Sequence, residues 1–147
     1  MDCWPKGQPT CRAKATTHRF FMCLLDKIKQ LAAAHHDIDV LWLYGSRARN
    51  SADQNSDYDL AVLFSSFHHD VLERRLRPEL LAMDWQQALG CSLSVIDITQ
   101  VSVPLAYTVV QDNCVLLSKD DFKQLETERI IMSKWDIDYQ HHLKHYA

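Results

Sequence analysis

The sequence predicts an α/β or α+β fold built around a small central sheet. Short apolar runs, typical of strands, alternate with longer segments in which apolar residues recur at every third or fourth position, as in amphipathic helices. The order is helix, strand, strand, helix, strand, helix, strand, helix, which argues against a helical bundle. With 147 residues the chain has the length of one compact domain. We therefore expect a single domain over 1–147, in which residues 1–16 form a loose N-terminal arm.

The composition argues against several classes of protein. The formal net charge is −3 at pH 7, whereas nucleic-acid binders usually carry a basic surplus, so we expect no direct nucleic-acid binding. No apolar run reaches the ~18 residues of a transmembrane helix, and residues 1–17 lack the apolar core of a secretory signal. The five cysteines form no C-x-x-C pair, which favours free thiols in a reducing compartment. We expect a cytoplasmic protein that does not interact with membranes.

The first helix is predicted to begin at Thr17, a suitable N-cap. Its apolar stripe, with spacings of three and four residues, comprises Phe21, Leu24, Leu25, Ile28 and Leu31. The next apolar run, 40–44, is typical of a strand that is buried on both faces. A second strand is predicted over 57–64, polar where it begins and apolar thereafter.

A second helix and a third strand follow. The helix is expected over 71–89, with Pro78 either kinking it or starting its second half. Gly90 is a natural residue to end this helix. The third strand is predicted over 93–98.

The last elements are a short helix, a short strand and a long helix. The short helix is expected over 102–112, where Pro104 is tolerated in the first turn. A fourth strand is predicted over 114–117. Ser118 and Asp121 resemble a capping box that opens the long helix.

The C-terminal helix, 118–147, carries one long apolar stripe. Its members are Phe122, Leu125, Met132, Trp135, Tyr139, Leu143 and Tyr146. At 1.5 Å per residue this helix would be roughly 40 Å long, which exceeds the ~30 Å diameter of a small domain. Either its far end protrudes and offers aromatic residues to a partner, or the helix bends around its own core.

The segment after the first strand has the features of an anion site. Gly45 allows another backbone, or a phosphate, to approach closely. Ser46 would start a short helix, whose N–H groups, dipole and hydroxyl would bind an anion. Arg47 and Arg49 add positive charge beside it, and the rigid fork of arginine donors suits phosphate.

Two carboxylates stand at the start of the second strand. Asp57 and Asp59 are two residues apart, so a strand directs both to the same face. Neighbouring carboxylates repel each other unless a cation lies between them, and Mg²⁺ binds through one or two carboxylates plus substrate phosphates. Each half of the pattern is weak alone, because such acids are often solvated strand ends. Together the turn and the strand predict a site for a nucleoside triphosphate bound to Mg²⁺.

This segment resembles the signature of the DNA polymerase β-like nucleotidyltransferase superfamily, in which Gly-Ser is followed after ten residues by Asp-x-Asp. In this chain the signature comprises Gly45-Ser46, residues 47–56 and Asp57-Tyr58-Asp59. The short length and the wording look most like the minimal nucleotidyltransferases (MNT), the antitoxins of HEPN/MNT toxin–antitoxin pairs. The resemblance covers about residues 20–118, with specific motifs at 45–60 only.

The resemblance implies a mixed sheet flanked by helices and a set of functional roles. Ser46 and its backbone would hold the triphosphate of ATP, and Asp57 and Asp59 would bind Mg²⁺. The reaction implied is the transfer of AMP from ATP to a tyrosine of a cognate HEPN toxin, which silences the ribonuclease activity of that toxin. The two proteins would form a hetero-oligomer.

The chain departs from the family pattern at two places. Asn50 replaces a usual Gly, and Asn is the next best residue at positive φ. Relatives often carry an Asp early in the third strand and another three residues later; here these positions are Ser94 and Asp97. The two have opposite parity, so only one faces the site in a regular strand, and a bulge or a different register would bring Asp97 in. We take Asp97 as the third carboxylate, metal ligand and general base.

Three functions compete. The first is the protein adenylyltransferase that acts on a toxin. The second is a non-catalytic antitoxin that neutralises by binding through its C-terminal helix. The third is a small-molecule nucleotidyltransferase, a class that usually needs an additional substrate-binding domain, for which this chain has little room.

Overall fold

Helices and strands follow one another in the predicted order. The computed structural model describes residues 23–52 and 55–146. The elements are α3 (Leu24–Ala34), β1 (Ile38–Tyr44), β2 (Tyr58–Phe64), α4 (Val71–Leu89), β3 (Leu93–Asp97), α5 (Val103–Asp112), β4 (Val115–Ser118) and α6 (Asp121–Tyr146). The strands form one sheet in the order β3-β2-β1-β4. Neighbours are antiparallel except β2 and β3, which are parallel. The predicted small mixed sheet with flanking helices is confirmed.

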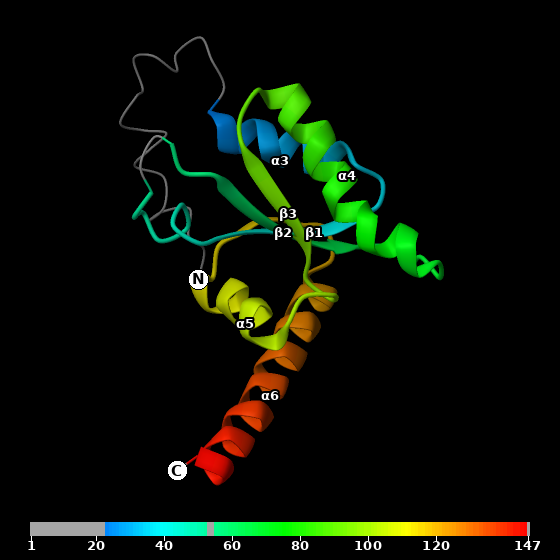
Figure 1. Ribbon diagram of the computed structural model, residues 1–147. Helices are drawn as coiled ribbons and strands as arrows, with labels where there is room; N and C mark the ends of the chain where they lie inside the picture. Colours follow the sequence, from blue (N-terminus) through cyan, green and yellow to red (C-terminus); the bar gives the residue numbers. More distant parts are fainter. Residues whose placement is uncertain (1–22, 53–54, 147) are drawn as a thin grey trace.

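The sheet separates two hydrophobic clusters. Helices α3 and α4 cover one face, and α5 and α6 cover the other (Figure 1). Alternate residues of β1 serve the two faces, because side chains alternate along a strand: Leu41 and Leu43 pack toward α3 and α4, whereas Val40 and Trp42 pack toward α5 and α6. This two-sided burial explains why the strand is a continuous apolar run.

The strand register brings three polar side chains together at one end of the sheet. Tyr44, the last residue of β1, lies opposite Asp59 of β2. Asp59 in turn lies beside Ser94 of β3. All three belong to the face that α5 and α6 cover, since their neighbours two residues along, such as Ala61 and Trp42, belong to that cluster.

Helix α4 spans the predicted residues, and its two ends have local causes. Asp70 Oδ1 accepts a hydrogen bond from the backbone N–H of Glu73 at 3.0 Å and so caps the N-terminus. Gly90 ends the helix in the left-handed conformation, at φ 67°. Pro78 lies buried inside the helix.

The predicted start of the last helix is wrong, and the start predicted at Thr17 is not tested by the described residues. Helix α3 begins at Leu24, after Cys23 with φ −56° and ψ 144°; Thr17 and residues 1–16 lie outside the described ranges. Ser118 is the last residue of β4 and not a cap, because the chain needs two more residues to leave the sheet. The cap of α6 is Asp120, whose Oδ1 accepts a hydrogen bond from the N–H of Lys123 at 3.1 Å.

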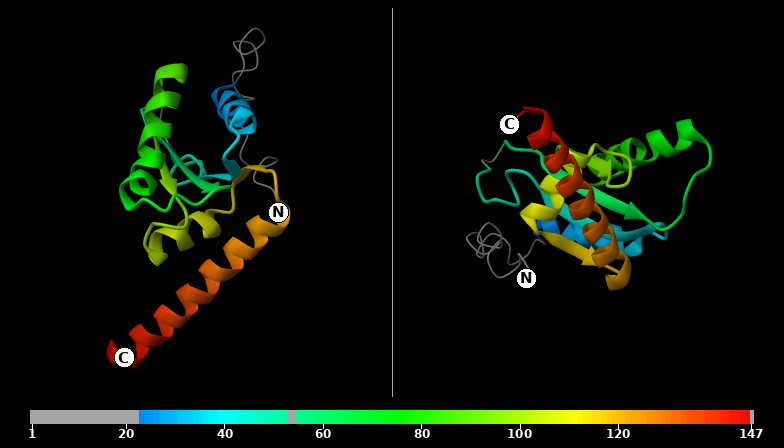
Figure 2. Two further views of the ribbon diagram at one scale, coloured as in Figure 1. Left: turned by 90° about the vertical axis from the view of Figure 1, so that its right-hand side faces the viewer. Right: turned by 90° about the horizontal axis from the view of Figure 1, so that it is seen from below.

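Helix α6 projects from the body of the molecule. It has 26 residues, which corresponds to ~39 Å. Ile131 is buried and Trp135 stacks on Tyr107 of α5 with ring centroids 4.4 Å apart, whereas residues 136–145 are all exposed. Figure 2 shows the distal half as a straight rod. Of the two alternatives, the helix protrudes and does not bend around its own core.

Two further expectations concern cysteines and membranes. Cys91 is a free thiol, but the expectation of free thiols is wrong for Cys23 and for Cys114, each of which takes part in a disulfide. Sequence spacing does not reveal which Cα atoms come within bonding reach. None of the described helices combines the length and the apolar composition that a membrane crossing requires.

Candidate active site

Gly45 begins the turn after β1 and lies against Asp59 of β2. Its φ is +78°, a conformation that glycine adopts without strain. A Cβ atom at this position would lie 2.6 Å from Asp59 Oδ2, so the carboxylate packs directly against the backbone where β1 ends. The two halves of the sequence motif are therefore brought together.

The residues after Gly45 form a turn and not the expected short helix. Residues 45–50 contain one helix-type hydrogen bond, from Arg49 N to Gly45 O at 3.1 Å, and then the backbone N–H of Ser51 returns to Ser46 O at 2.9 Å. Asn50 closes the turn at φ 59°, which confirms its expected positive φ. Within the described part of the chain, the backbone N–H groups of residues 46–48 have no acceptor. These donors remain available to an anion.

Asp57 and Asp59 have unlike surroundings. Asp57 directly precedes β2 and is exposed, while Asp59 is half-buried inside the strand. The side chain of Asp59 uses both oxygens: Oδ2 lies against Gly45, and Oδ1 accepts a hydrogen bond from Ser94 Oγ at 3.0 Å. Asp59 is thus fixed in place, and Asp57 is open to solvent beside it in sequence.

Arg47 is engaged with the protein. Its Nη2 and Nε donate to Ser56 O at 2.8 and 3.3 Å, and its guanidinium lies 4.1 Å from the ring centroid of Tyr58. Ser56 and Tyr58 are the two neighbours of Asp57, so this arginine contacts the backbone on one side of that residue and the aromatic ring on the other. Burial raises the pKa of Tyr58, although the charge of Arg47 opposes the rise. Tyr58 therefore stays a neutral phenol.

Arg49 remains largely open. Its side chain is 58% exposed, its Nε donates to Gly45 O at 3.3 Å, and it lies 3.9 Å from Asp112 Oδ1. It is the cation of the turn that keeps donors free for a ligand, because Arg carries five N–H donors.

A comparison with known protein families decides what this arrangement is. The family model described as polymerase beta, nucleotidyltransferase, matches residues 26–122. The chain belongs to this nucleotidyltransferase family. No curated protein matches the chain.

Solved structures with the same fold come from toxin–antitoxin complexes. A toxin–antitoxin complex with AMP-PNP superposes with a TM-score of 0.65 at 22% identity, over 84% of this chain and 94% of that chain. An MntA–HepT complex gives 0.62 at 20%, over 82% and 92%. The complex of the tri-AMPylated Shewanella oneidensis HEPN toxin with its MNT antitoxin gives 0.63 at 19%, over 82% and 91%. At these identities the likeness establishes the fold.

The third carboxylate of the nucleotidyltransferase pattern is absent from the group formed by Tyr44, Asp59 and Ser94. Ser94 occupies the position beside Asp59, while β3 continues in unbroken register to Asp97, which pairs with Val62. No bulge turns Asp97 toward Asp59. Within the described ranges, no group of three or more His, Cys, Asp or Glu side chains is arranged to hold a metal ion.

Asp97 instead closes the turn after β3. It is 4% exposed, and its Oδ1 accepts from the backbone N–H of Thr99 at 2.9 Å and from Thr99 Oγ1 at 2.7 Å. Its Oδ2 accepts from Gln100 Nε2 at 2.8 Å and lies 4.0 Å from Arg77 Nη2. These contacts use both carboxylate oxygens.

Sequence reasoning missed Asp112, which binds the backbone at the start of the turn. This residue ends α5, its side chain is 8% exposed, and its Oδ2 accepts from Gly45 N at 2.8 Å. A carboxylate in the last turn of a helix opposes the helix dipole, which is the one signal in the sequence that marks it. The two partners are 67 positions apart in the sequence, which excludes any local prediction of the contact.

Tyr44 is the buried member of the group that it forms with Asp59 and Ser94. Burial and then the charge of Asp59 raise the pKa of its phenol, while hydrogen bonding with Ser94 opposes the rise. Tyr44, Ser94 and Asp59 thus form a connected polar group in which the tyrosine stays protonated at neutral pH.

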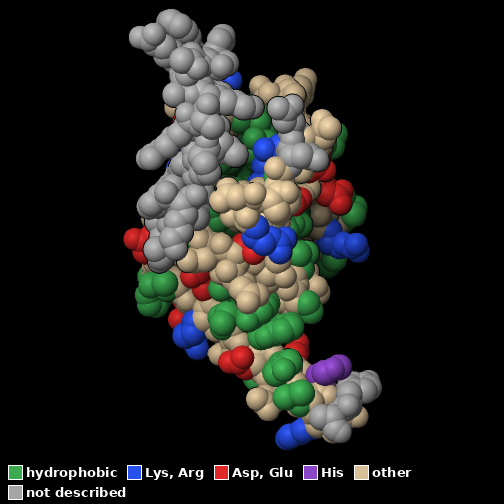
Figure 3. Space-filling view, turned by 90° about the vertical axis from the view of Figure 1, so that its left-hand side faces the viewer, with side chains coloured by type: hydrophobic (Ala, Val, Ile, Leu, Met, Phe, Trp, Pro, Cys, Tyr) green, Lys and Arg blue, Asp and Glu red, His purple; other side chains and the backbone are tan. Residues whose placement is uncertain are grey.

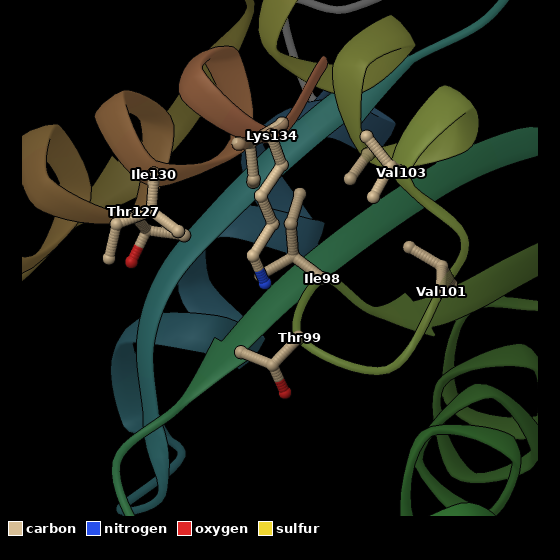
Figure 4. Close-up of a pocket in the computed structure, with 9 residues that line it drawn as sticks. Ile98, Thr99, Val101, Val103, Thr127, Ile130 and Lys134 are labelled. Carbon is tan, nitrogen blue, oxygen red and sulfur yellow. The ribbon is translucent and has the colours of Figure 1, made fainter. Parts of the chain in front are cut away.

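A separate cavity of about 170 Å³ lies between the β3–α5 loop, α5 and α6. Its lining is mostly aliphatic, and Lys134 extends into it from α6 (Figure 4). None of the motif residues lines it, so this cavity is separate from the turn and the acids at Gly45, Asp57 and Asp59.

Proposed function

We propose that this nucleotidyltransferase-family protein is an antitoxin that transfers AMP from ATP to a tyrosine of a cognate HEPN toxin. The contact between Gly45 and the Asp59 carboxylate carries the proposal, because it joins a turn with open N–H groups to a pair of acids. The AMP-PNP complex and the AMPylated HEPN toxin among the structural neighbours support the nucleotide and the acceptor.

The acids that are present fit a magnesium ion. Mg²⁺ prefers oxygen ligands and commonly uses one or two carboxylates together with substrate phosphates. Asp57 offers an exposed carboxylate, and Asp59 is held ready by Ser94 and by the absence of a Cβ at position 45. When bound there, the ion would neutralise phosphate charge.

The turn supplies the phosphate-binding groups. The open N–H groups of residues 46–48 and the hydroxyl of Ser46 would donate to the β- and γ-phosphates. Arg49 would add charge-assisted hydrogen bonds, as exposed arginines do with phosphates. Arg47 acts differently from our expectation: it is a positioning residue that fixes Asp57 through Ser56 and Tyr58.

In the reaction, the tyrosine oxygen of the toxin attacks the α-phosphorus of ATP. The new bond joins that oxygen to the α-phosphorus, and the bond from the α-phosphorus to the bridging oxygen of the β-phosphate breaks, so that pyrophosphate leaves. Ser94 does not accept the phenolic proton, and Asp97 is committed to its own turn. The proton therefore passes to water, and positioning supplies most of the rate.

Ser94 also supports the second candidate function. A nucleotidyltransferase without the third carboxylate lacks the usual base, so the protein would neutralise its toxin by binding alone. Helix α6 offers the surface for that contact in either case. Its exposed apolar residues on one side are Leu125, Met132, Tyr139 and Leu143, and Figure 3 shows hydrophobic side chains recurring along the projecting helix at the bottom of the view.

Mass spectrometry of the toxin separates these functions. The chain is incubated with ATP, Mg²⁺ and a HEPN protein encoded beside it. We expect one or more AMP increments on the toxin, which Asp57→Asn and Asp59→Asn abolish and the control Asp26→Asn, an exposed acid on α3, preserves.

Two outcomes would count against the adenylyltransferase. Undiminished increments with the Asp57 and Asp59 variants would remove these acids from the chemistry. A stable complex without any increment for the unmodified chain would leave the binding antitoxin.

A further inference from the structure

Helix α4 has two apolar faces, and only one of them is covered. Its buried face packs on the sheet through Pro78, Leu81, Ala82 and Trp85. The opposite side carries a second stripe with spacings of four, four and three residues. This outer stripe consists of Leu72, Leu76, Leu80 and Met83, which are 65%, 39%, 56% and 63% exposed.

The outer stripe lies on an open side of the molecule. In Figures 1 and 2, α4 lies at the boundary of the fold, and no described element lies beyond it. Val71 and Phe67, 60% and 64% exposed, extend the apolar surface past the helix N-terminus. An amphipathic helix normally exposes polar residues on this side, so the stripe is typical of an interaction surface.

One edge of the stripe carries a positive and a negative side chain, so the same edge of a second copy, running in the opposite direction, would match its charges. Arg75 and Glu79 are both exposed, lie one helical turn apart on the same flank, and form no ion pair within the described residues. Position 77 is the midpoint of this pair, and the stripe from Leu72 to Met83 is centred within one residue of it. A two-fold axis at this point would place each arginine opposite the glutamate of a second copy.

We propose that the outer stripe of α4 is a homodimer interface, in which the α4 helices of two copies pack antiparallel. Around an axis at position 77, the leucines of the two copies would alternate at intervals of about 3 Å along the helices. Leu76 of each copy would lie nearest the axis, and Arg75 of each would face the partner's Glu79. On the other flank Glu73 is already matched by His68, with Nδ1 and Oε2 3.6 Å apart.

The size of the patch fits a dimer of moderate affinity. Six large side chains that are 39–65% exposed offer on the order of 500 Å² per copy. Two copies would bury on the order of 1,000 Å² together, near the lower limit of specific interfaces. We therefore expect a dissociation constant of about micromolar order. No candidate site residue lies on this surface, so the proposal is independent of the nucleotide chemistry.

Sedimentation equilibrium of the isolated full chain tests the interface. We expect a monomer–dimer equilibrium that Leu76→Asp or Leu80→Asp weakens at least tenfold. The control Ile137→Asp, at a 68% exposed position on α6, leaves it unchanged. Circular dichroism confirms that each variant is folded. A chain that stays monomeric at all concentrations, or a dimer that these α4 variants do not weaken, overturns the proposal.

Charge exchange tests the antiparallel arrangement. Arg75→Glu or Glu79→Arg alone places like charges opposite each other twice and should weaken the dimer about tenfold. The double variant R75E/E79R restores both pairs and should bring the dissociation constant back to within about threefold of its original value. If the double variant is as weak as the single ones, the two copies do not pair in this way.

Discussion

Gly45 is subject to two constraints at once. Its φ of +78° disfavours any side chain, and the space for a Cβ is taken by Asp59 Oδ2 at 2.6 Å. Gly90 has a similar φ of +67°, but nothing lies within 4 Å of its missing Cβ. Substitutions at the two glycines therefore distinguish two destabilising effects. Both strain the backbone, but only a side chain at position 45 also displaces the Asp59 carboxylate.

Gly45→Ala should impair nucleotide binding more than it impairs folding. Since Asp59 must rotate away, we expect at least a tenfold loss of nucleotide affinity and a loss of roughly 1–3 kcal/mol in the free energy of unfolding. Urea unfolding and nucleotide titration measure the two effects. Gly90→Ala should cost about 1–2 kcal/mol through its conformation alone and leave the affinity unchanged. Equal affinity for both variants would show that Asp59 does not serve the site.

The sequence reveals the motif residues but not the residues that hold them. Gly45, Asp57 and Asp59 are adjacent to strand ends, so the spacing alone predicts that they are close together. Asp112 reaches Gly45 only because α5 returns beneath β1, a contact that sequence spacing cannot show. The role of Arg47 was also hidden. Its acceptor is a backbone carbonyl, and since every residue carries one, the sequence does not mark which carbonyl is used.

Among the elements, α6 is joined to the central strand by a hydrogen bond from a buried tryptophan. Trp42 of β1 is fully buried, and its Nε1 donates to Glu128 Oε2 at 3.0 Å. Nearby, Ile131 is buried and Trp135 stacks on Tyr107. The hydrogen bond spans 86 residues and connects the central strand to the helix.

Glu128→Ala should destabilise the protein by roughly 1–3 kcal/mol, because it leaves the buried indole N–H without an acceptor. Glu128→Gln retains an acceptor and should recover most of that loss. The free energy of unfolding in urea measures both effects. Glu126→Ala, which removes an exposed pair with Arg129, is the matched control and should change little. A control that destabilises as much as Glu128→Ala would argue against the buried contact as the cause.

Element types follow from periodicity, whereas element ends depend on contacts. Helix α4 agrees with its prediction since Asp70 and Gly90 are local signals. Strand β1 begins earlier than predicted, at Ile38, because Asp39 is paired with Lys123 Nζ at 2.8 Å and so tolerates a place in the strand. The short helix expected after Gly45 is a turn, since Ser51 N bonds to Ser46 O.

Across the whole molecule, stability should depend on a histidine at the α3–β1 connection. Burial and then the charge of His36 lower the pKa of His35. Its Nδ1 accepts a hydrogen bond from Asp37 N at 3.1 Å, which requires an unprotonated Nδ1. The folded state therefore binds a proton less readily than the unfolded state, whose histidine titrates at about pH 6.5.

This contribution to stability is complete above the unfolded pKa and is lost as the pH falls through the lowered folded pKa. We expect the urea midpoint to decrease as the pH is lowered from about 7.5 to about 5.5. His35→Asn retains an acceptor and should make the midpoint less dependent on pH. An equal dependence in both proteins would assign the effect to other groups.

The proposed nucleotide site lies at the end of the sheet where β1, β2 and β3 bring Gly45, Asp59 and Ser94 together. Calorimetric titration of the isolated protein with AMP-PNP and Mg²⁺ tests this site. We predict binding that requires the divalent ion, that falls at least tenfold in Asp59→Asn, and that persists in folded Asp97→Asn. Binding that is as tight in Asp59→Asn as in the unmodified chain would refute a nucleotide site at these residues.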